Sequence, residues 1–249
     1  MQGPAVAERP KILIPGARRR RRVLRDVSLV LIISGVLLLA DAGVTLLWQE
    51  PLTAVIALIK RGEIDNRFLS YKAAPLSELD RRALAAMRSM RERIAFLARQ
   101  ERRAVRTGDA IGTIQLPNIG TYTVVQGTDT ASLEKGPGHY PQTAFPGVGQ
   151  TVAIAGHRTT YLAPFRHLDS VKPGQKIVLT MRYARFTYSV QYSRVVDPTA
   201  WWITRNVGYD RLVLSACNPL YSAAQRIIVF ARLQDVEPLG AAASASPSA

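Results

Sequence analysis

The sequence predicts a mainly β protein: a β-barrel with short helices, preceded by a helical stalk and one N-terminal transmembrane helix. Three observations lead to this prediction. An uncharged run rich in Leu, Val and Ile follows a cluster of arginines near the N-terminus. A segment with apolar residues at helical spacing comes next, and from residue 108 onward short apolar stretches alternate with turn residues. The 249 residues suffice for one or two domains with a sizeable core.

Composition excludes several classes of protein. The chain is 47% hydrophobic, which is too high for a mostly disordered protein. One Cys cannot form an internal disulfide or a thiolate cluster, and three His argue against a multi-His zinc site, so we expect neither a disulfide scaffold nor a metal site. The net charge of +15 falls mainly in residues 1–26 and 60–107, outside the predicted barrel. Since it comes with no nucleic-acid reader motif, the expected partner is a membrane surface and not nucleic acid.

The transmembrane anchor is predicted at residues 27–48. The cluster Arg18–Arg22 precedes it, and it contains no charged residue before Asp41. As a helix, these 22 residues reach about 33 Å, which crosses the hydrocarbon core of a bilayer. Asp41 costs about 3 kcal/mol at the bilayer centre and less towards the end of the span, where it lies. Trp48 is suited to the far interface.

The arginines set the expected orientation of this span. By the positive-inside rule, residues 1–26 form a basic cytoplasmic segment, and the chain crosses the cell membrane once, with its main domain extracellular. A cleaved signal peptide is the alternative, because Ala40-Asp41-Ala42 fits a small-x-small cleavage site. The apolar character continues past that site, which favours the anchor. Both interpretations place residues 49–249 outside the cell.

Residues 49–107 are predicted to form a helical juxtamembrane stalk. Apolar residues over 79–97 follow helical spacing, with Arg and Glu between them. Ser77 is the expected N-cap, with Asp80 three residues on in a variant of the capping box, and the helix is expected to run to about Val105. A stalk, a flap over a site, a dimer seam and a helix packed on its own domain all fit this pattern.

The barrel is expected over residues 108–236, where short apolar or alternating stretches are separated by turns. Pro117-Asn118-Ile119-Gly120 has the composition of a hairpin turn, and 131–136 that of a short helical turn at most. Short strands with few helices are typical of a closed or nearly closed barrel. The tail, 237–249, is rich in Ala, Ser and Pro and is expected to be disordered. The predicted strands are 110–116, 122–126, 151–155, 176–181, 186–196, 211–216 and 226–233.

Two predicted strand ends carry side chains suited to nucleophilic catalysis. Cys217 ends an apolar strand that Asn218-Pro219 breaks, and an unpaired Cys outside the cell is exposed to oxidation. His157 follows another strand and a Gly, and an imidazole supplies the base or cation that a Cys nucleophile needs. An inert buried thiol and a structural His are the alternatives, and each residue alone leaves them open.

Arg226 is the third candidate, nine residues after Cys217 at the start of the next predicted strand. If the two strands pair antiparallel, its guanidinium returns to the barrel end where Cys217 lies. There it would stabilise an oxyanion or hold a substrate carbonyl. The alternative is an edge-strand Arg that points into water.

Together these residues resemble the active-site motifs of sortases. The motifs are Leu212-Val213-Leu214-Ser215-Ala216-Cys217-Asn218-Pro219 with Arg226 nine residues after the Cys, and Gly156-His157-Arg158 about sixty residues earlier. Gly136-Pro137-Gly138-His139-Tyr140 is similar to the glycine-rich element of class D and class E sortases. The Cys-Asn-Pro motif and the short Cys-to-Arg spacing also point to these two classes. The resemblance covers about residues 108–236 and the N-terminal anchor.

The resemblance implies an eight-stranded barrel and a cysteine transpeptidase without cofactor or metal. Such an enzyme cuts a sorting signal of the LAxTG or LPxTG type between Thr and Gly, and holds the acyl group as a thioester until an amine takes it. The implied partners are surface proteins that bear a C-terminal sorting signal and an amine acceptor, either a cell-wall precursor or a pilin Lys. The implied outcome is cell-wall anchoring or pilus assembly.

By position, the resemblance implies Cys217 as the nucleophile, His157 as the acid/base, and Arg226 as the group that stabilises the oxyanion or positions substrate. The family pattern Thr-Leu-x-Thr-Cys is changed here, because Val213 and Ala216 replace the two Thr. Losing a hydroxyl beside the Cys removes a hydrogen bond to substrate worth about 1 kcal/mol. The expected substrate-binding residues are His139, Tyr140, Ser215, Ala216 and Asn218.

Two other classes of function compete with a sortase. An L,D-transpeptidase is also a Cys/His enzyme of the cell wall, but that family has Ser-x-Gly-Cys with an Arg shortly after. Here Ser215-Ala216-Cys217 lacks the Gly, and Arg226 lies further on. The second rival is a non-catalytic, membrane-anchored scaffold whose barrel binds a peptide. A thiol probe separates it from an enzyme, since a scaffold has no need of a reactive Cys.

Overall fold

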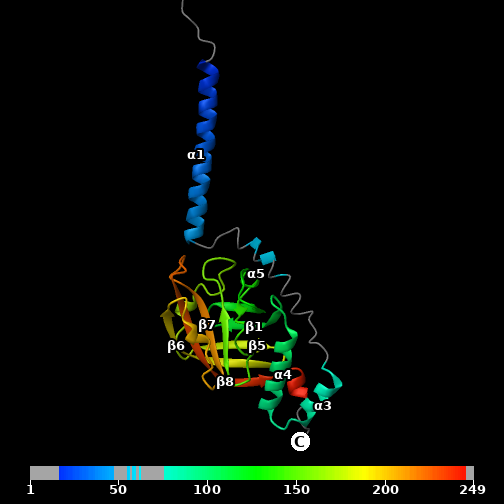
Figure 1. The fold of residues 1–249 in the computed structure, drawn as a ribbon. Helices are drawn as coiled ribbons and strands as arrows, with labels where there is room; N and C mark the ends of the chain where they lie inside the picture. Colours follow the sequence, from blue (N-terminus) through cyan, green and yellow to red (C-terminus); the bar gives the residue numbers. More distant parts are fainter. Residues whose placement is uncertain (1–16, 48–54, 57, 60–61, 63–75, 245–249) are drawn as a thin grey trace, which may run out of the picture. The chain divides into compact units, whose positions relative to one another are not determined.

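The computed structural model describes residues 17–47, 55–56, 58–59, 62 and 76–244 (Figure 1). The chain divides into two compact units, Met1–Trp48 and Gln49–Ala249. Helix α1, Ala17–Leu47, contains a stretch, Arg20–Val44, that is long and apolar enough to cross a membrane. The predicted apolar helix is therefore confirmed, whereas its expected last residue, Trp48, lies outside the described residues.

The second unit contains a closed barrel of eight strands, in the order β1-β2-β3-β4-β7-β8-β6-β5. The β2–β3 and β4–β7 pairs are parallel, and the other neighbours are antiparallel. Three predicted strands are reproduced to the residue, and the other four are longer than predicted. The strands are β1 Ala110–Leu116, β2 Gly120–Gln126, β3 Gly138–His139, β4 Thr151–Ala155, β5 Lys176–Met181, β6 Ala184–Val196, β7 Arg211–Asn218 and β8 Gln225–Pro238.

Strand β3 is the one that the sequence does not predict, because two residues are too few to show an alternating pattern. It pairs with β2 on one side and β4 on the other, and so completes the barrel. Gly138 permits this pairing, since a Cβ atom there would lie 2.1 Å from the carbonyl oxygen of Gly127.

Within residues 76–107, the structure has two helices where one was expected: α3, Glu78–Ala86, and α4, Met90–Ala104. The predicted cap of the first is present, because the Asp80 amide donates to the Ser77 hydroxyl at 3.1 Å. The prediction of a continuous helix is wrong. Ser89 and Glu92 form a complete capping box, which starts a second helix in the middle of the predicted one.

Both helices pack onto the barrel (Figure 1). Leu84 of α3 and Ile94 and Leu97 of α4 belong to the same buried cluster as the barrel interior. Residues 78–104 are therefore part of the barrel's own unit, which corrects the expectation of a stalk for this stretch. Most of 49–75, the rest of the expected stalk, lies outside the described residues.

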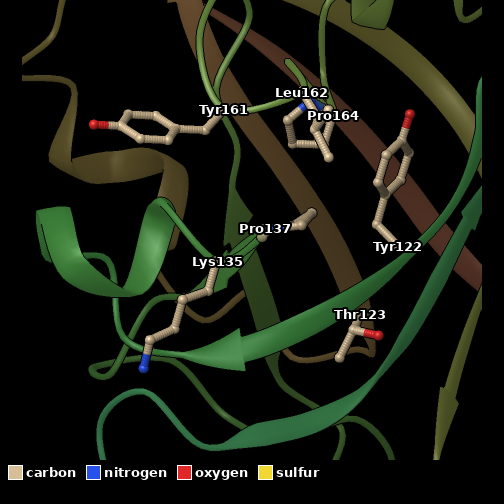
Figure 2. Close-up of a pocket in the computed structure, with 8 residues that line it drawn as sticks. Tyr122, Thr123, Lys135, Pro137, Tyr161, Leu162 and Pro164 are labelled. Carbon is tan, nitrogen blue, oxygen red and sulfur yellow. The ribbon is translucent and has the colours of Figure 1, made fainter. Parts of the chain in front are cut away.

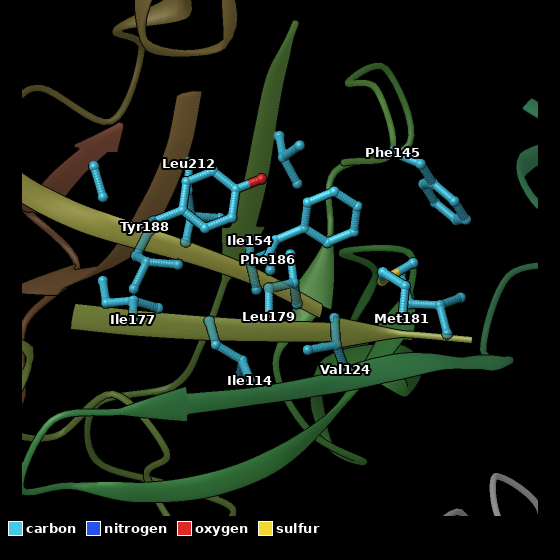
Figure 3. Packing of buried hydrophobic residues seen from close by; sticks show 14 of the residues in the cluster. Ile114, Val124, Phe145, Ile154, Ile177, Leu179, Met181, Phe186, Tyr188 and Leu212 are labelled. Carbon is cyan, nitrogen blue, oxygen red and sulfur yellow. The ribbon is translucent and has the colours of Figure 1, made fainter. Parts of the chain in front are cut away.

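Large apolar side chains from many strands fill the barrel, among them Ile114, Leu179, Phe186 and Leu212 (Figure 3). The connections contain short helices: α5 Thr130–Leu133, η1 Leu168–Ser170 and η2 Trp201–Thr204.

The C-terminal segment differs from the expected disordered tail. β8 continues to Pro238, and α6, Ala241–Ser244, buries Ala242 in the core cluster. The expectation is wrong for residues 237–244, and 245–249 lie outside the described residues.

Candidate active site

The parallel pairing of β4 with β7 brings two of the predicted catalytic residues to one edge of the sheet. Ala155 pairs with Ser215, and the Gly156 amide donates to the Ser215 carbonyl at 3.0 Å. His157 and Cys217 each follow this last pair by two residues. Gly156 is required at this point, because a Cβ atom there would lie 2.6 Å from the Phe165 ring.

The antiparallel pairing of β7 with β8 brings the third predicted catalytic residue, Arg226, to the same edge. Cys217 and Arg226 are directly opposite each other in the register, as expected if Arg226 returns to the end where Cys217 lies. Nη1 of Arg226 donates to the main-chain carbonyls of Ala223 at 2.9 Å and of Gln225 at 2.8 Å. Arg226 is half-buried as a residue, and these bonds hold its guanidinium against the β7–β8 loop that follows the nucleophile.

Strand alternation decides which residues of β7 share the face of Cys217. Ala216 lies in the core cluster, so its side chain is on the opposite face. This corrects the prediction that Ala216 binds substrate, and a Thr hydroxyl at that position would point into the core. Ser215 and Val213 are on the Cys217 face, which is the outer face of the barrel.

A second apolar cluster covers this outer face. It consists of Ala153, Ile203, Val213, Ile228 and Phe230. Tyr140 packs against it, and the Tyr140 amide donates to the Ala153 carbonyl at 2.9 Å. The predicted substrate-binding residues Tyr140 and Ser215 therefore lie on the face that carries the nucleophile.

Cys217 also lines an open cleft, with an empty volume of about 670 Å³ that includes the solvent at its mouth. The cleft separates the segment after His157 from the β7–β8 loop. Its other lining residues are Arg158, Thr159, Pro219, Tyr221, Ser222 and Ala223. The half-buried thiol is thus reachable from outside.

His157 has the environment of a neutral base. Its ring lies 5.2 Å from the Tyr161 ring, and its Nε2 atom is buried with no hydrogen-bond partner among the described residues. Burial lowers the pKa of His157 below its usual value, and the negative charge of Glu134 opposes part of that shift. An uncharged imidazole with an unpaired nitrogen can accept a proton from a thiol or an amine.

Arg158 is a site residue that the sequence analysis misses. Its side chain is 3% exposed, and Nη1 donates to Asn218 Oδ1 at 2.9 Å and to the Cys217 carbonyl at 3.3 Å. Nε donates to the Arg166 carbonyl at 3.3 Å, and Nη2 pairs with Asp169 at 2.9 Å. The residue next to the candidate base therefore holds the main chain of the candidate nucleophile.

Asn218 belongs to the same network. Its Oδ1 accepts from Arg158, and its Nδ2 donates to Gln225 Oε1 at 3.2 Å, across the β7–β8 pair. These contacts support a role in fixing the loop beside Cys217. The expected contact with substrate stays a prediction.

His139 is not at the surface of the site. Its side chain is 1% exposed and packs edge-on against Phe145, with Nδ1 2.9 Å from Gln126 Oε1 and Nε2 3.0 Å from the Ala144 carbonyl. Burial lowers its pKa to about 4. This placement argues against the substrate-binding assignment of His139, because the buried ring is bonded to Gln126 and to the main chain of the following loop. In the part of the chain that the structure describes, no group of three or more His, Cys, Asp or Glu could hold a metal ion.

Comparisons with known proteins agree with this arrangement. The model of the sortase domain matches residues 114–234. Sortase D of Bacillus subtilis is 31% identical over 131 residues, which are 51% of this chain and 65% of that protein. Sortase E1 of Streptomyces coelicolor is 24% identical over 152 residues, 53% of this chain and 42% of that protein. The matched segment thus spans less than two thirds of either relative.

A solved structure supports the fold. The sortase D5 transpeptidase from Clostridium perfringens matches with a TM-score of 0.52 at 22% identity, over 73% of this chain and 99% of that one. At this identity the likeness concerns the barrel and its topology.

Proposed function

Because residues 114–234 form a domain of the sortase family, we propose that this protein is a membrane-anchored cysteine transpeptidase. Its proposed substrate is a sorting signal of the LAxTG or LPxTG type, cut between Thr and Gly, and its proposed second substrate is an amine. The single observation that carries the proposal is the convergence of His157, Cys217 and Arg226 at one sheet edge. Neither the L,D-transpeptidase pattern nor a scaffold accounts for that convergence.

In the first step, the sulfur of Cys217 attacks the carbonyl carbon of the Thr residue. His157 takes the thiol proton and passes it to the nitrogen of the departing Gly. The C–N bond breaks, a C–S bond forms, and the acyl fragment stays on the enzyme as a thioester. In the second step an amine attacks this thioester, a new C–N bond forms and the C–S bond breaks, and His157 carries a proton from the amine nitrogen to the Cys217 sulfur.

Arg226 would stabilise the negative oxygen that develops in both steps. A guanidinium has five N–H donors, and the two main-chain bonds in this structure are both made from Nη1. The other nitrogens can therefore reach an oxyanion without the loop losing its hold on the side chain. Such a donor is worth about 10²–10³ in rate.

The apolar part of the sorting signal would bind on the outer-face cluster. Tyr140, which is partly buried at the edge of this cluster, offers contact for the Leu of the signal, and the buried Val213 and Ile203 support it from below. This face leads along β7 to Cys217, so a bound strand would bring its Thr carbonyl to the sulfur. The sortase E1 of Streptomyces coelicolor has been solved with a tripeptide in its active site.

Arg158 is proposed as a positioning residue. It lies beside the base in sequence and bonds to the carbonyl of the nucleophile, so it holds the two at a constant separation. The planar guanidinium of Arg158 can donate to several acceptors at once, whereas the single ammonium group of a Lys cannot reach all of them.

The N-terminal helix would act as the anchor. Residues 1–26 are proposed to be cytoplasmic, and the barrel to lie outside the cell, where surface proteins with a sorting signal and a cell-wall precursor or pilin Lys are found. The charge of the arginines that precede the helix supports this orientation.

The experiment that tests the function uses full-length protein in detergent with an LAxTG and an LPxTG peptide, each with and without triglycine. We expect cleavage after Thr in all cases, and a Thr–triglycine product only when the amine is present. Products cut at another bond, or no cut at all, would contradict the proposal.

A further inference from the structure

We propose that Tyr161, held in place by Glu134, is a positioning residue for His157: its ring keeps the imidazole in the orientation in which it exchanges protons with the reacting groups. This inference rests on the proposed transpeptidase function and adds to it two residues that the steps described above do not use. Neither residue belongs to the Cys, His and Arg motifs.

His157 and Tyr161 belong to one loop, and the two ends of that loop meet. The Phe165 amide donates to the His157 carbonyl at 2.9 Å. The Phe165 ring also fills the space beside Gly156, where a Cβ atom would lie 2.6 Å from it. The main chain of His157 is therefore fixed where the loop closes, and Tyr161 lies midway between the two ends.

The main chain around Tyr161 has an uncommon conformation. Tyr161, Leu162 and Ala163 have φ values of 50°, 63° and 41°, all in the left-handed region that residues with a Cβ seldom adopt. Such conformations persist only where the surrounding structure imposes them, and they are concentrated at functional sites. Figure 2 shows that the Tyr161 side chain points away from Leu162 and Pro164. The turn thus directs the Tyr161 ring away from its neighbours in sequence.

The partner of that ring is the imidazole of His157. The two ring centroids are 5.2 Å apart and the rings are tilted by 37°. This separation falls in the range of about 4.5–7 Å that favourable ring pairs adopt. Nε2 of His157 is buried and has no hydrogen-bond partner among the residues that the structure describes. Since no hydrogen bond to this nitrogen orients the imidazole, its orientation depends on packing, and Tyr161 supplies a packing contact.

Glu134 holds Tyr161 from another segment of the chain. The Tyr161 hydroxyl donates to Glu134 Oε1 at 3.0 Å, although the two residues are 27 positions apart in sequence. The main chain of Glu134 is itself fixed, because its amide donates to the Thr130 carbonyl of α5 at 3.0 Å. A hydrogen bond to a carboxylate is stronger than one between neutral groups. The short helix α5 therefore supports the Tyr161 ring, and through it the imidazole.

A positioning role predicts a loss of kcat and not of peptide binding. A displacement of about 1 Å between reacting groups costs about 10²-fold in rate. With full-length protein in detergent and an LAxTG peptide, we expect kcat to fall about 10- to 10²-fold in Tyr161→Leu, and KM to stay within about twofold. Tyr161→Phe keeps the ring and loses one hydrogen bond, so its kcat should stay within about fivefold of wild type.

The control removes a Tyr ring elsewhere in the barrel. Tyr209 packs against the Arg232 guanidinium, 4.8 Å from its ring centroid, and precedes β7 at the end opposite Cys217. Tyr209→Leu should therefore match wild type in kcat and KM. Circular dichroism checks that each variant is folded. If Tyr161→Leu does not fold, Glu134→Ala takes its place, because it removes the support and leaves the ring; its kcat should fall at least threefold.

Nuclear magnetic resonance observes the His157 ring without any substrate. The chain has three His, so ¹³C-labelled histidine gives three imidazole signals, and His157→Gln identifies the relevant one. An aromatic ring shifts the resonances of a group packed on its face. We expect the shift that Tyr161 causes at His157 to be lost in Tyr161→Leu and retained in Tyr161→Phe.

Glu134→Gln separates the hydrogen bond from the charge. The amide oxygen of Gln can still accept from Tyr161, so kcat should stay within about twofold at the optimum pH. Burial lowers the pKa of His157 and the Glu134 charge opposes that shift, so the pKa should fall further in Glu134→Gln. Arg158 and Cys217, the ionisable neighbours at this edge, are unchanged in the variant. Asp129→Asn, at the other end of α5, keeps the helix cap and should leave the pKa unaltered.

An unchanged kcat and an unchanged His157 resonance in Tyr161→Leu would overturn the positioning role, as would a kcat within twofold of wild type in Glu134→Ala. A higher KM with an unchanged kcat would overturn it too, because Tyr161 would then contact the peptide. If Tyr161→Phe loses as much kcat as Tyr161→Leu, the hydroxyl acts and the ring does not, which contradicts the proposal. If the wild-type protein cleaves no peptide, the proposed function itself fails, whereas the resonance measurements still decide whether Tyr161 holds the His157 ring.

Discussion

Replacing Arg158 with Met tests how the nucleophile and the base are held together. Met retains an unbranched apolar chain but removes the guanidinium, so Asn218 Oδ1 and the carbonyls of Cys217 and Arg166 lose their donor. We expect a loss of both folding stability and turnover. Turnover is measured at a temperature at which the variant is still folded, so that a lower rate does not merely reflect unfolded protein.

The size of the stability loss follows from the contacts. The bond to Asn218 is 2.9 Å and its donor is charged, so it contributes about 1.5–3 kcal/mol. The two carbonyl bonds are 3.3 Å and weaker. The Asp169 side chain is 55% exposed, so solvent reduces its ion pair to about 1 kcal/mol or less. The free energy of unfolding should fall by about 3–4 kcal/mol in Arg158→Met, and by less than about 1 kcal/mol in the control Asp169→Asn.

Arg158→Met should also lower kcat more than the control Asp169→Asn does. A displacement of about 1 Å between reacting groups costs about 10²-fold, so kcat should fall by that factor while KM changes little. Arg158→Lys can meet only one of the acceptors and should recover part of the activity. Urea unfolding gives the stability, and cleavage of an LAxTG peptide gives kcat and KM. If folded Arg158→Met keeps kcat within about threefold of wild type, Arg158 is structural only and the positioning argument is wrong.

Four further predictions concern single groups. Burial holds the pKa of His139 at about 4 in the folded protein, against 6.5 in the unfolded chain. Its contribution to the free energy of unfolding, about 3 kcal/mol, is therefore complete above pH 6.5 and is lost as the pH falls through 4. His139→Gln should flatten the acid side of a plot of unfolding free energy against pH. His157→Ala should lower turnover by about 10²–10⁴ in a peptide assay, and a loss below tenfold would reassign the base. Arg226→Lys should bind peptide nearly normally but turn over about 10²–10³ times more slowly, whereas Arg232→Ala, further along β8, should match wild type. Protease added to intact cells should remove the barrel, and a protected barrel would contradict the proposed orientation.

The strands were predictable because most have a length and an alternation that the sequence displays. The runs 151–155 and 176–181 are bounded by turn residues, and the structure reproduces them to the residue. The two-residue β3 has no such pattern. The break between α3 and α4 does have a signal, Ser89 followed three residues later by Glu92, but the apolar spacing continues across it and suggests a single helix.

The sequence allowed the site residues at the ends of paired strands to be predicted. Cys217 and Arg226 are close in sequence, and a hairpin brings them into register. The side of Ala216 also follows from alternation, because a residue next to an outward-facing Cys must face inward. The role of Arg158 could not be predicted in this way. Its partners Cys217 and Asn218 are 59 and 60 residues away in sequence, and only the folded chain shows that they are in contact.

The most direct test of the account is the mass of the enzyme during reaction. Full-length wild-type protein and Cys217→Ala are mixed with an LAxTG peptide without an amine, quenched in acid, and measured intact and after digestion. The account predicts an adduct equal to the fragment up to Thr, attached at Cys217 and removed by hydroxylamine, with neither adduct nor cleavage in Cys217→Ala. Cleavage that persists in Cys217→Ala, or an adduct on another residue, would contradict it.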